Sequence, residues 1–141
     1  MNRGAIFCFG MVALACAWML FVPAPGQGNQ EEAVKSAVDS YVQAFASGDG
    51  KAACDQLNEA ARQAVTGMSV KIGAKDCPSA MEKTRQIGGS QVRAIARKIR
   101  VRKVDVKGST ARVTLRAAGQ DSVAELEKVG SKWKISSLPK A

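Results

Sequence analysis

Residues 104–138, VDVKGSTARVTLRAAGQDSVAELEKVGSKWKISSL, decide the fold of this chain. Apolar and polar residues alternate along this stretch, and short turn-forming pairs interrupt the alternation. This pattern is typical of an antiparallel meander with one buried face. The turns are predicted at Gly108 with Ser109, Gln120 with Asp121 and Gly130 with Ser131. They separate strands predicted at 92–106, 110–118, 122–129 and 132–138.

Two-residue loops at these turns fix the register of the three hairpins. Apolar residues then face apolar residues, and acidic residues face basic ones, as neighbouring strands of one sheet require. The predicted cross-strand pairs are Val104 with Val113, Asp105 with Arg112, Leu115 with Leu126, Arg116 with Glu125, Leu126 with Ile135 and Glu127 with Lys134. In the first strand the apolar residues are odd-numbered at Ile99 and Val101 but even-numbered at Val104 and Val106. This change at Arg102 and Lys103 predicts a bulge that bends the sheet.

The region before the meander has helical periodicity. Residues 30–47 carry an apolar stripe that ends at Gly48, and residues 51–65 form either one helix or two short helices separated at Asn58. Residues 66–75 are ambiguous, with a short strand at 69–72 as one option. A further helix begins at Pro78, runs to about Ile87 and ends at the following glycines. The sequence therefore predicts an α+β fold, in which N-terminal helices pack on the concave face of a curved antiparallel meander.

The amino terminus resembles a targeting segment. After Arg3, residues 5–22 contain no charge, and the length of this run lies between that of an export signal and that of a membrane-spanning helix. Small residues at Ala24 and Gly26 favour cleavage before Gln27, whereas the residues around Cys16 match a lipid-attachment site poorly. We expect a signal peptide or membrane anchor at 1–26, a linker at 27–30 and one domain at 31–139. The domain is expected outside the cytoplasm, secreted or anchored to the outer face of the cytoplasmic membrane.

Two cysteines lie within the predicted domain. Cys54 and Cys77 form an even pair in a compartment expected to be oxidising, which predicts a structural disulfide. The alternative is a redox-active pair, but redox-active disulfides favour the closely spaced Cys-x-x-Cys arrangement.

Composition limits the chemistry of the chain. Its 141 residues include 21 Lys and Arg, 12 Asp and Glu, and no His, which excludes imidazole catalysis and the common zinc sites. We therefore assign no catalytic residue, metal ligand or cofactor. The formal net charge of +9 is concentrated in the meander, where a basic surface is predicted on the outer face at Lys98, Arg100, Arg102, Arg112 and Arg116.

This basic surface would attract anionic lipid head groups, anionic wall polymers or an acidic protein. The alternative is a solvated edge that only prevents aggregation. Nucleic acid is not an expected partner, because the domain is expected to be exported and these basic strands carry no Phe or Tyr on which bases could stack.

The order of these features resembles the nuclear-transport-factor-2-like (cystatin-like, cone-shaped) superfamily, especially its small exported bacterial members. The similarity covers about residues 31–138 and rests on three groups of residues: Tyr41, Val42, Phe45, Ser47, Gly48 and Asp49; Ala53, Cys54, Leu57 and Ala61; and the closing run from Gly130 to Ile135. The resemblance implies a curved sheet wrapped on helices into a cone, a pocket at the open end in many members, and frequent dimers through the sheet. Core packing and the lining of such a pocket are both compatible with the positions of Tyr41 and Trp133.

Two classes of function follow. The first is a noncatalytic exported domain that binds a small ligand, an anionic surface or a partner protein, a class that includes accessory subunits of secretion or wall-synthesis machines. The second is an isomerase- or cyclase-type enzyme on the same fold, which would need a carboxylate side chain in the pocket to act as the general base. The predicted inward-facing strand positions are apolar and include no acid.

Overall fold

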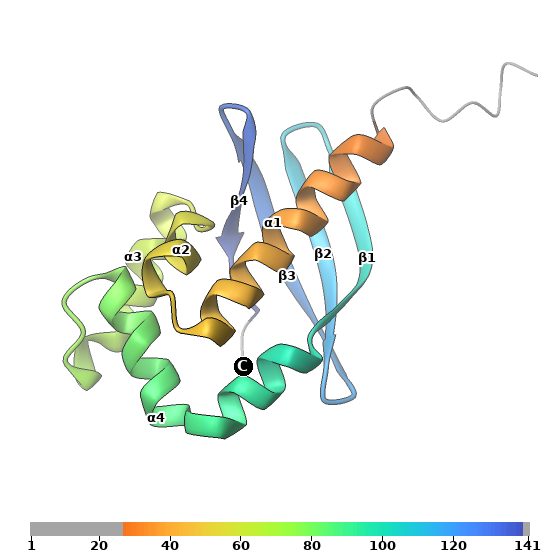
Figure 1. Cartoon of the computed structure of the whole chain (residues 1–141). Coiled ribbons are helices and arrows are strands. Elements are labelled where there is room, and N and C mark those ends of the chain that lie inside the picture. The colour runs from red at the N-terminus through yellow and green to blue at the C-terminus, as the bar shows by residue number, and fades with distance from the viewer. Residues whose placement is uncertain (1–26, 140–141) are drawn as a thin grey trace, which may run out of the picture.

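The computed structural model describes residues 27–139, so the predicted signal or anchor segment lies outside the described residues (Figure 1). The described chain is an α+β domain in which helices come first and a four-stranded antiparallel sheet follows, as predicted. The helices are α1 (Gln27–Ser47), α2 (Gly50–Asp55), α3 (Glu59–Ser69), the short 3₁₀ helix η1 (Val70–Ile72) and α4 (Cys77–Lys98). The strands are β1 (Arg100–Lys107), β2 (Thr110–Ala117), β3 (Gln120–Val129) and β4 (Lys132–Ser137), and they neighbour one another in chain order.

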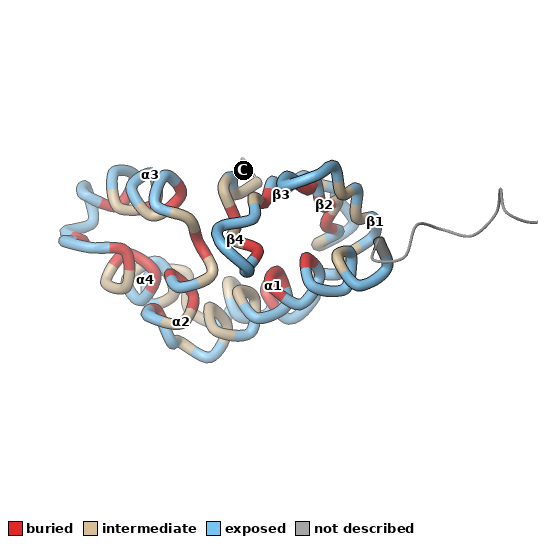
Figure 2. The backbone as a smooth tube through the Cα atoms, turned by 90° about the horizontal axis from the view of Figure 1, so that it is seen from above, coloured by how far each residue is buried: buried red, intermediate tan, exposed pale blue. Residues whose placement is uncertain are grey.

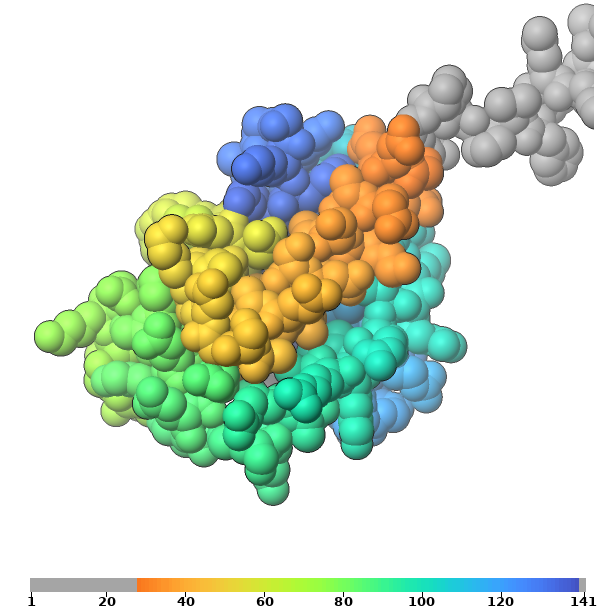
Figure 3. All heavy atoms as spheres, viewed as in Figure 1, coloured from red at the N-terminus to blue at the C-terminus, as the bar shows by residue number. Residues whose placement is uncertain are grey.

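The helices pack on one face of the sheet. Buried positions alternate along β2, and Figure 2 shows the buried parts of α1 and of the strands on the sides that face each other. Figure 3 shows α1, α2 and α4 covering the side of the molecule turned toward the viewer. The largest fully buried side chains are Val34, Val38, Leu57, Val113, Leu126 and Ile135. The core cluster and both cysteines fall between Val34 and Ile135, so a chain that begins at Gln27 keeps the whole described core.

The first and last hairpins have the predicted register. Val104 pairs with Val113 and Leu126 pairs with Ile135, and the predicted bulge is present between Val101 and Lys103. The predicted register of the middle hairpin is wrong. Its turn lies at Ala118 and Gly119, and the sequence-based turn at Gln120 and Asp121 belongs to β3 instead.

The middle turn has a backbone reason for its position. Ala118 and Gly119 both have positive φ angles, 50° and 82°, the combination that a two-residue hairpin turn with the twist of the strands requires. The observed pairs are Leu115 with Ser122, Arg116 with Asp121, Arg112 with Glu125 and Ala111 with Leu126. Because the loop still has two residues, the partner of Leu115 changes by an even number of residues, from Leu126 to Ser122, so Leu115 and Leu126 stay on the buried face.

The helical region differs from the prediction in three places and confirms one of its two alternatives for residues 51–65. Helix α1 begins at Gln27 and includes the residues assigned to a linker. The alternative of two short helices is confirmed, because Asn58 separates α2 from α3 and its side chain accepts a hydrogen bond from Ala61 N at 2.8 Å. The strand considered at 69–72 is wrong: the chain continues from α3 into η1 and has no strand partner there.

The third difference concerns the glycines after Ile87, which kink α4 but do not end it. Gly89 has φ 53° and ψ −138°, a backbone conformation that side chains with a Cβ rarely adopt. The helix resumes after this kink and continues to Lys98, so the strand predicted from residue 92 begins only at Arg100. The reason lies in the pattern of Val92, Ile95, Ala96 and Ile99, which recur at helical spacing immediately before the alternation of the strands begins.

A disulfide joins α2 to the start of α4, as predicted. The Cα atoms of Cys54 and Cys77 lie 6.1 Å apart, and both side chains are buried. Asp76 and Ser79 form a reciprocal capping box at the same helix start. This end of α4 is therefore fixed by a covalent bond and by satisfied backbone donors.

Candidate functional site

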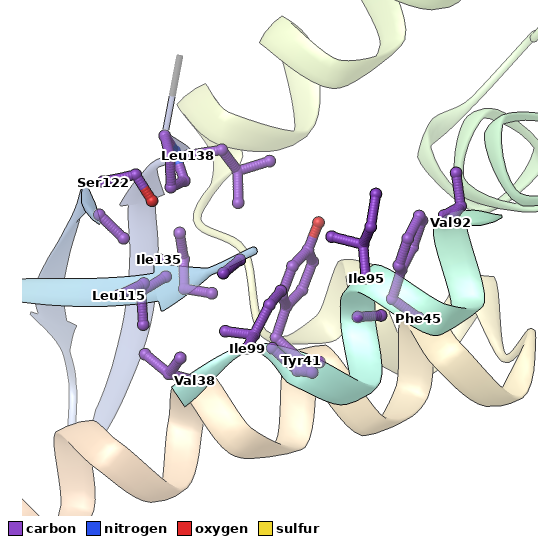
Figure 4. Close-up of a pocket in the computed structure, with 15 residues that line it drawn as sticks. Val38, Tyr41, Phe45, Val92, Ile95, Ile99, Leu115, Ser122, Ile135 and Leu138 are labelled. Atoms are coloured by element: carbon purple, nitrogen blue, oxygen red, sulfur yellow. The ribbon is translucent and has the colours of Figure 1, made fainter. Parts of the chain in front are cut away.

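A cavity of about 350 Å³ lies between α1, the part of α4 beyond its kink, and the inner face of the sheet (Figure 4). Its volume falls in the range of sites that hold small molecules. Its walls come from α1 (Val38, Tyr41, Val42, Phe45), from α4 and the residue after it (Val92, Ile95, Ala96, Ile99), from the sheet (Leu115, Ala117, Ser122, Ala124, Ile135) and from the carboxyl-terminal residues Leu138 and Pro139.

The kink at Gly89 builds this cavity. Before the kink, α4 packs Ala80 and Met81 into the core beside the disulfide. After the kink, the helix turns toward β1 and places its apolar side opposite α1 (Figures 1 and 4). A straight continuation of α4 would leave one wall of the cavity open, so the unusual backbone of Gly89 positions the site.

The lining is almost entirely apolar. Tyr41 and Ser122 supply the only polar side-chain groups among the lining residues, and no acidic or basic side chain is present there. The cavity can therefore hold apolar matter by removing it from water, and its two hydroxyls can orient a polar group of the occupant. The lining residues supply no carboxylate that could serve as the base of an isomerase.

Tyr41 projects from α1 with its hydroxyl directed away from that helix, between Ile95 and Leu138 in Figure 4. Its ring stacks on Phe45, with centroids 6.2 Å apart, and its hydroxyl contacts the Met81 sulfur at 3.9 Å. Burial raises the pKa of Tyr41 to about 12. The hydroxyl therefore stays protonated near neutral pH, and it can exchange its weak hydrogen bond to the Met81 sulfur for a bond donated to an oxygen of a bound molecule.

Ile95 marks the mouth of the cavity. Its side chain is 48% exposed, whereas every other lining residue is buried or half-buried. The cavity therefore opens to solvent beside the last two turns of α4.

The structure separates the two aromatic residues considered for a pocket. Tyr41 lines the cavity, whereas Trp133 is buried in the core and is not among the lining residues. The wall that sequence reasoning missed is the helical segment with Val92, Ile95 and Ile99, since these residues were assigned to a strand. Their helical spacing was the available signal.

The predicted basic residues do not share one strand face. Lys98 is the last residue of α4, and Arg102 lies at the bulge. The guanidinium of Arg100 donates to the carbonyls of Arg97 and Ile99, at 2.7 and 2.8 Å, and so caps the end of α4. Arg112 pairs with Glu125 at 3.5 Å and Arg116 with Asp121 at 3.7 Å, which partly neutralises the outer face of the sheet.

A second apolar feature lies at the other end of the helical layer. Met68, Val70 and Ile72 are 73%, 62% and 38% exposed, and we call them the α3–η1 patch. Its three residues belong to α3 and η1 and lie on the surface, whereas the cavity is enclosed by helices and by the sheet. It provides an internal comparison for binding of apolar molecules.

Comparisons with protein-family models, with curated proteins and with solved structures find no match for this chain. Within residues 27–139, no helix is both long enough and apolar enough to cross a membrane. The same residues contain no cluster of three Cys, Asp or Glu side chains suited to a metal ion. The disulfide suggests an oxidising environment.

Proposed function

We propose that this chain is a noncatalytic exported domain that binds one small apolar molecule in the cavity between α1, α4 and the sheet. The observation that carries the proposal is the apolar cavity itself, with its mouth at Ile95 and two hydroxyls in its walls. Helices followed by a bulged meander also support the resemblance to the nuclear-transport-factor-2-like superfamily. The buried disulfide supports export, in line with a signal peptide or anchor at 1–26.

Binding in this cavity needs no chemistry beyond burial and one or two hydrogen bonds. Each 1 Å² of apolar surface removed from water contributes roughly 25 cal/mol. A small molecule with an apolar body and one oxygen acceptor therefore matches the lining, with its oxygen at the hydroxyl of Tyr41 or Ser122. Since the lining carries no carboxylate, binding rather than proton abstraction is the function that we propose.

A neutral, environment-sensitive dye such as N-phenyl-1-naphthylamine tests the proposal on residues 27–141. We expect saturable fluorescence enhancement with one dye molecule per chain. The variant Ala96→Leu fills the cavity from the wall of α4 and should abolish the enhancement. The matched control is Ala94→Leu, which adds the same atoms at an exposed position of the same helix and should leave binding unchanged.

Equal binding by both variants, with their folding verified by circular dichroism, would refute binding in the cavity. Absence of any saturable enhancement in the unmodified chain, when neutral alkanols also fail to bind, would refute the proposed function as a whole.

A further inference from the structure

The part of α4 after the kink has two contrasting sides. Val92, Ile95, Ala96 and Ile99 face the cavity, whereas Arg93, Arg97 and Lys98 are exposed. At 100° per residue, Lys98 lies on the flank of Ile95, three residues further along the helix, and Arg93 lies on the opposite flank. Arg97 points away from the cavity. Cations therefore border an apolar wall at the position where the cavity opens.

The charge around this mouth is not balanced by neighbouring acids. Residues 93–107 contain seven Lys and Arg side chains and a single acid, Asp105. Of the five ion pairs in the described part of the chain, only one involves this segment, between Lys103 and Asp105 at 2.9 Å. The segment that supplies the mouth thus has cations available for an external anion.

From this juxtaposition we propose that the ligand of the cavity is an anionic amphiphile, with its apolar chain among the walls and its carboxylate or phosphate head beside Lys98. This inference rests on the proposed function and names the class of its ligand. The head group must stay at the mouth, because burying an unpaired anion in the apolar interior is costly. Lys98 at the rim is suited to hold it while both charges stay partly solvated.

Four decyl compounds measured by isothermal titration on residues 27–141, below their micellar concentrations, test the inference. They are decanoate, decyl phosphate, 1-decanol and decyltrimethylammonium. Wild type should bind the two anions about fivefold more tightly than the cation, with a difference that shrinks as salt rises. Inorganic phosphate without a chain should not bind, which distinguishes an amphiphile from a free anion.

Two variants of equal charge change localise the head group. Lys98→Gln should weaken decanoate binding about threefold to fivefold and leave decanol unaffected. Arg97→Gln removes the same charge one residue away on the far side of the helix and should have less than half that effect on decanoate.

The outcomes separate the two proposals. Equal binding of anionic, neutral and cationic decyl compounds would overturn the anionic ligand and leave the apolar site in place. Equal losses for the two variants would also overturn it, because a diffuse field would then explain the preference. Failure of all four compounds to bind would remove the proposed function itself.

Discussion

The two halves of α4 differ in what holds them. Residues 77–88 begin at a disulfide and a capping box and bury Ala80 and Met81 in the core. Residues 90–98 follow the kink at Gly89 and leave Ile95 half-exposed at the mouth of a cavity. The difference indicates a division of labour along one helix: the first half stabilises the fold, and the second half forms a binding wall.

This division has an energetic basis. Side chains around a cavity lose packing contacts with the atoms that would otherwise fill it, so the cavity end contributes less to stability than a filled core does. The disulfide end offsets that loss, because a covalent link lowers the entropy of the unfolded chain. We therefore expect substitutions at the disulfide end to change stability and substitutions at the cavity end to change binding.

The largest contrast is expected between Leu57 and Ile95. Leu57 is 1% exposed at the α2–α3 connection, so Leu57→Ala should lower the free energy of unfolding by about 2–5 kcal/mol. Ile95→Ala, at a half-exposed position, should lower it by less than about 1 kcal/mol and yet weaken dye binding. Urea denaturation measures the free energy of unfolding of both variants, and dye titration measures their binding. Equal losses of stability in the two variants would contradict the expected contrast.

Removal of the disulfide should have the next largest effect. The double variant Cys54→Ala with Cys77→Ala opens a loop of 23 residue steps and should cost about 3 kcal/mol of stability. The folded double variant should bind the neutral dye with unchanged affinity, because neither cysteine lines the cavity. A loss of affinity in the folded fraction would show that the two ends are coupled.

A smaller contrast is expected between two polar side chains, one that joins the helices to the sheet and one in the wall of the cavity. Asn58 caps α3 and also donates to Glu127 Oε1 at 2.7 Å, which ties the helices to the sheet. Asn58→Ala should therefore cost about 1–2 kcal/mol. Ser122→Ala, in the cavity wall, should stay within about 0.5 kcal/mol of wild type in the same denaturation experiment. A larger loss of stability for Ser122→Ala than for Asn58→Ala would contradict this expectation.

The last prediction, which has no effect on stability at neutral pH, concerns the ionisation of Tyr41, the only tyrosine of the chain. Because burial raises its pKa to about 12, the native tyrosine should ionise well above the ordinary value near 10. The unfolded chain loses this proton first, so stability should fall as pH rises from about 10 to 12 and be insensitive to this group below pH 10. Absorbance at 295 nm follows the ionisation, and Tyr41→Phe should remove this part of the pH dependence.

Elements marked by a clear pattern among neighbouring residues could be predicted from the sequence, and the others could not. The stripe with Val34, Val38 and Tyr41 has one period, and it correctly predicted a helix whose buried side faces the core. The outer hairpins were also predicted correctly, since Gly108 and Gly130 mark their turns. In the middle hairpin the local signal favoured the wrong turn, because Ala118 is not a residue type expected at positive φ.

The candidate site was harder to predict than the fold. Tyr41 is a pocket candidate from the sequence, but the opposite wall comes from Val92, Ile95 and Ile99, whose short helical pattern directly precedes the alternation of the strands. Gly88 and Gly89 indicate an interruption of the helix and do not reveal that it resumes. The cavity arises where that resumed helix meets α1 and the sheet, which is a tertiary arrangement beyond any local pattern.

The most direct test of binding at the cavity end is a methyl ¹H–¹³C NMR titration of residues 27–141 with 1-decanol. The account predicts shifts that saturate at one equivalent and concentrate in Val42, Val92, Ile95 and Leu138, while Val70 and Ile72 of the exposed α3–η1 patch stay unchanged. Shifts concentrated in the α3–η1 patch, or an absence of saturable shifts in the cavity walls, would contradict it.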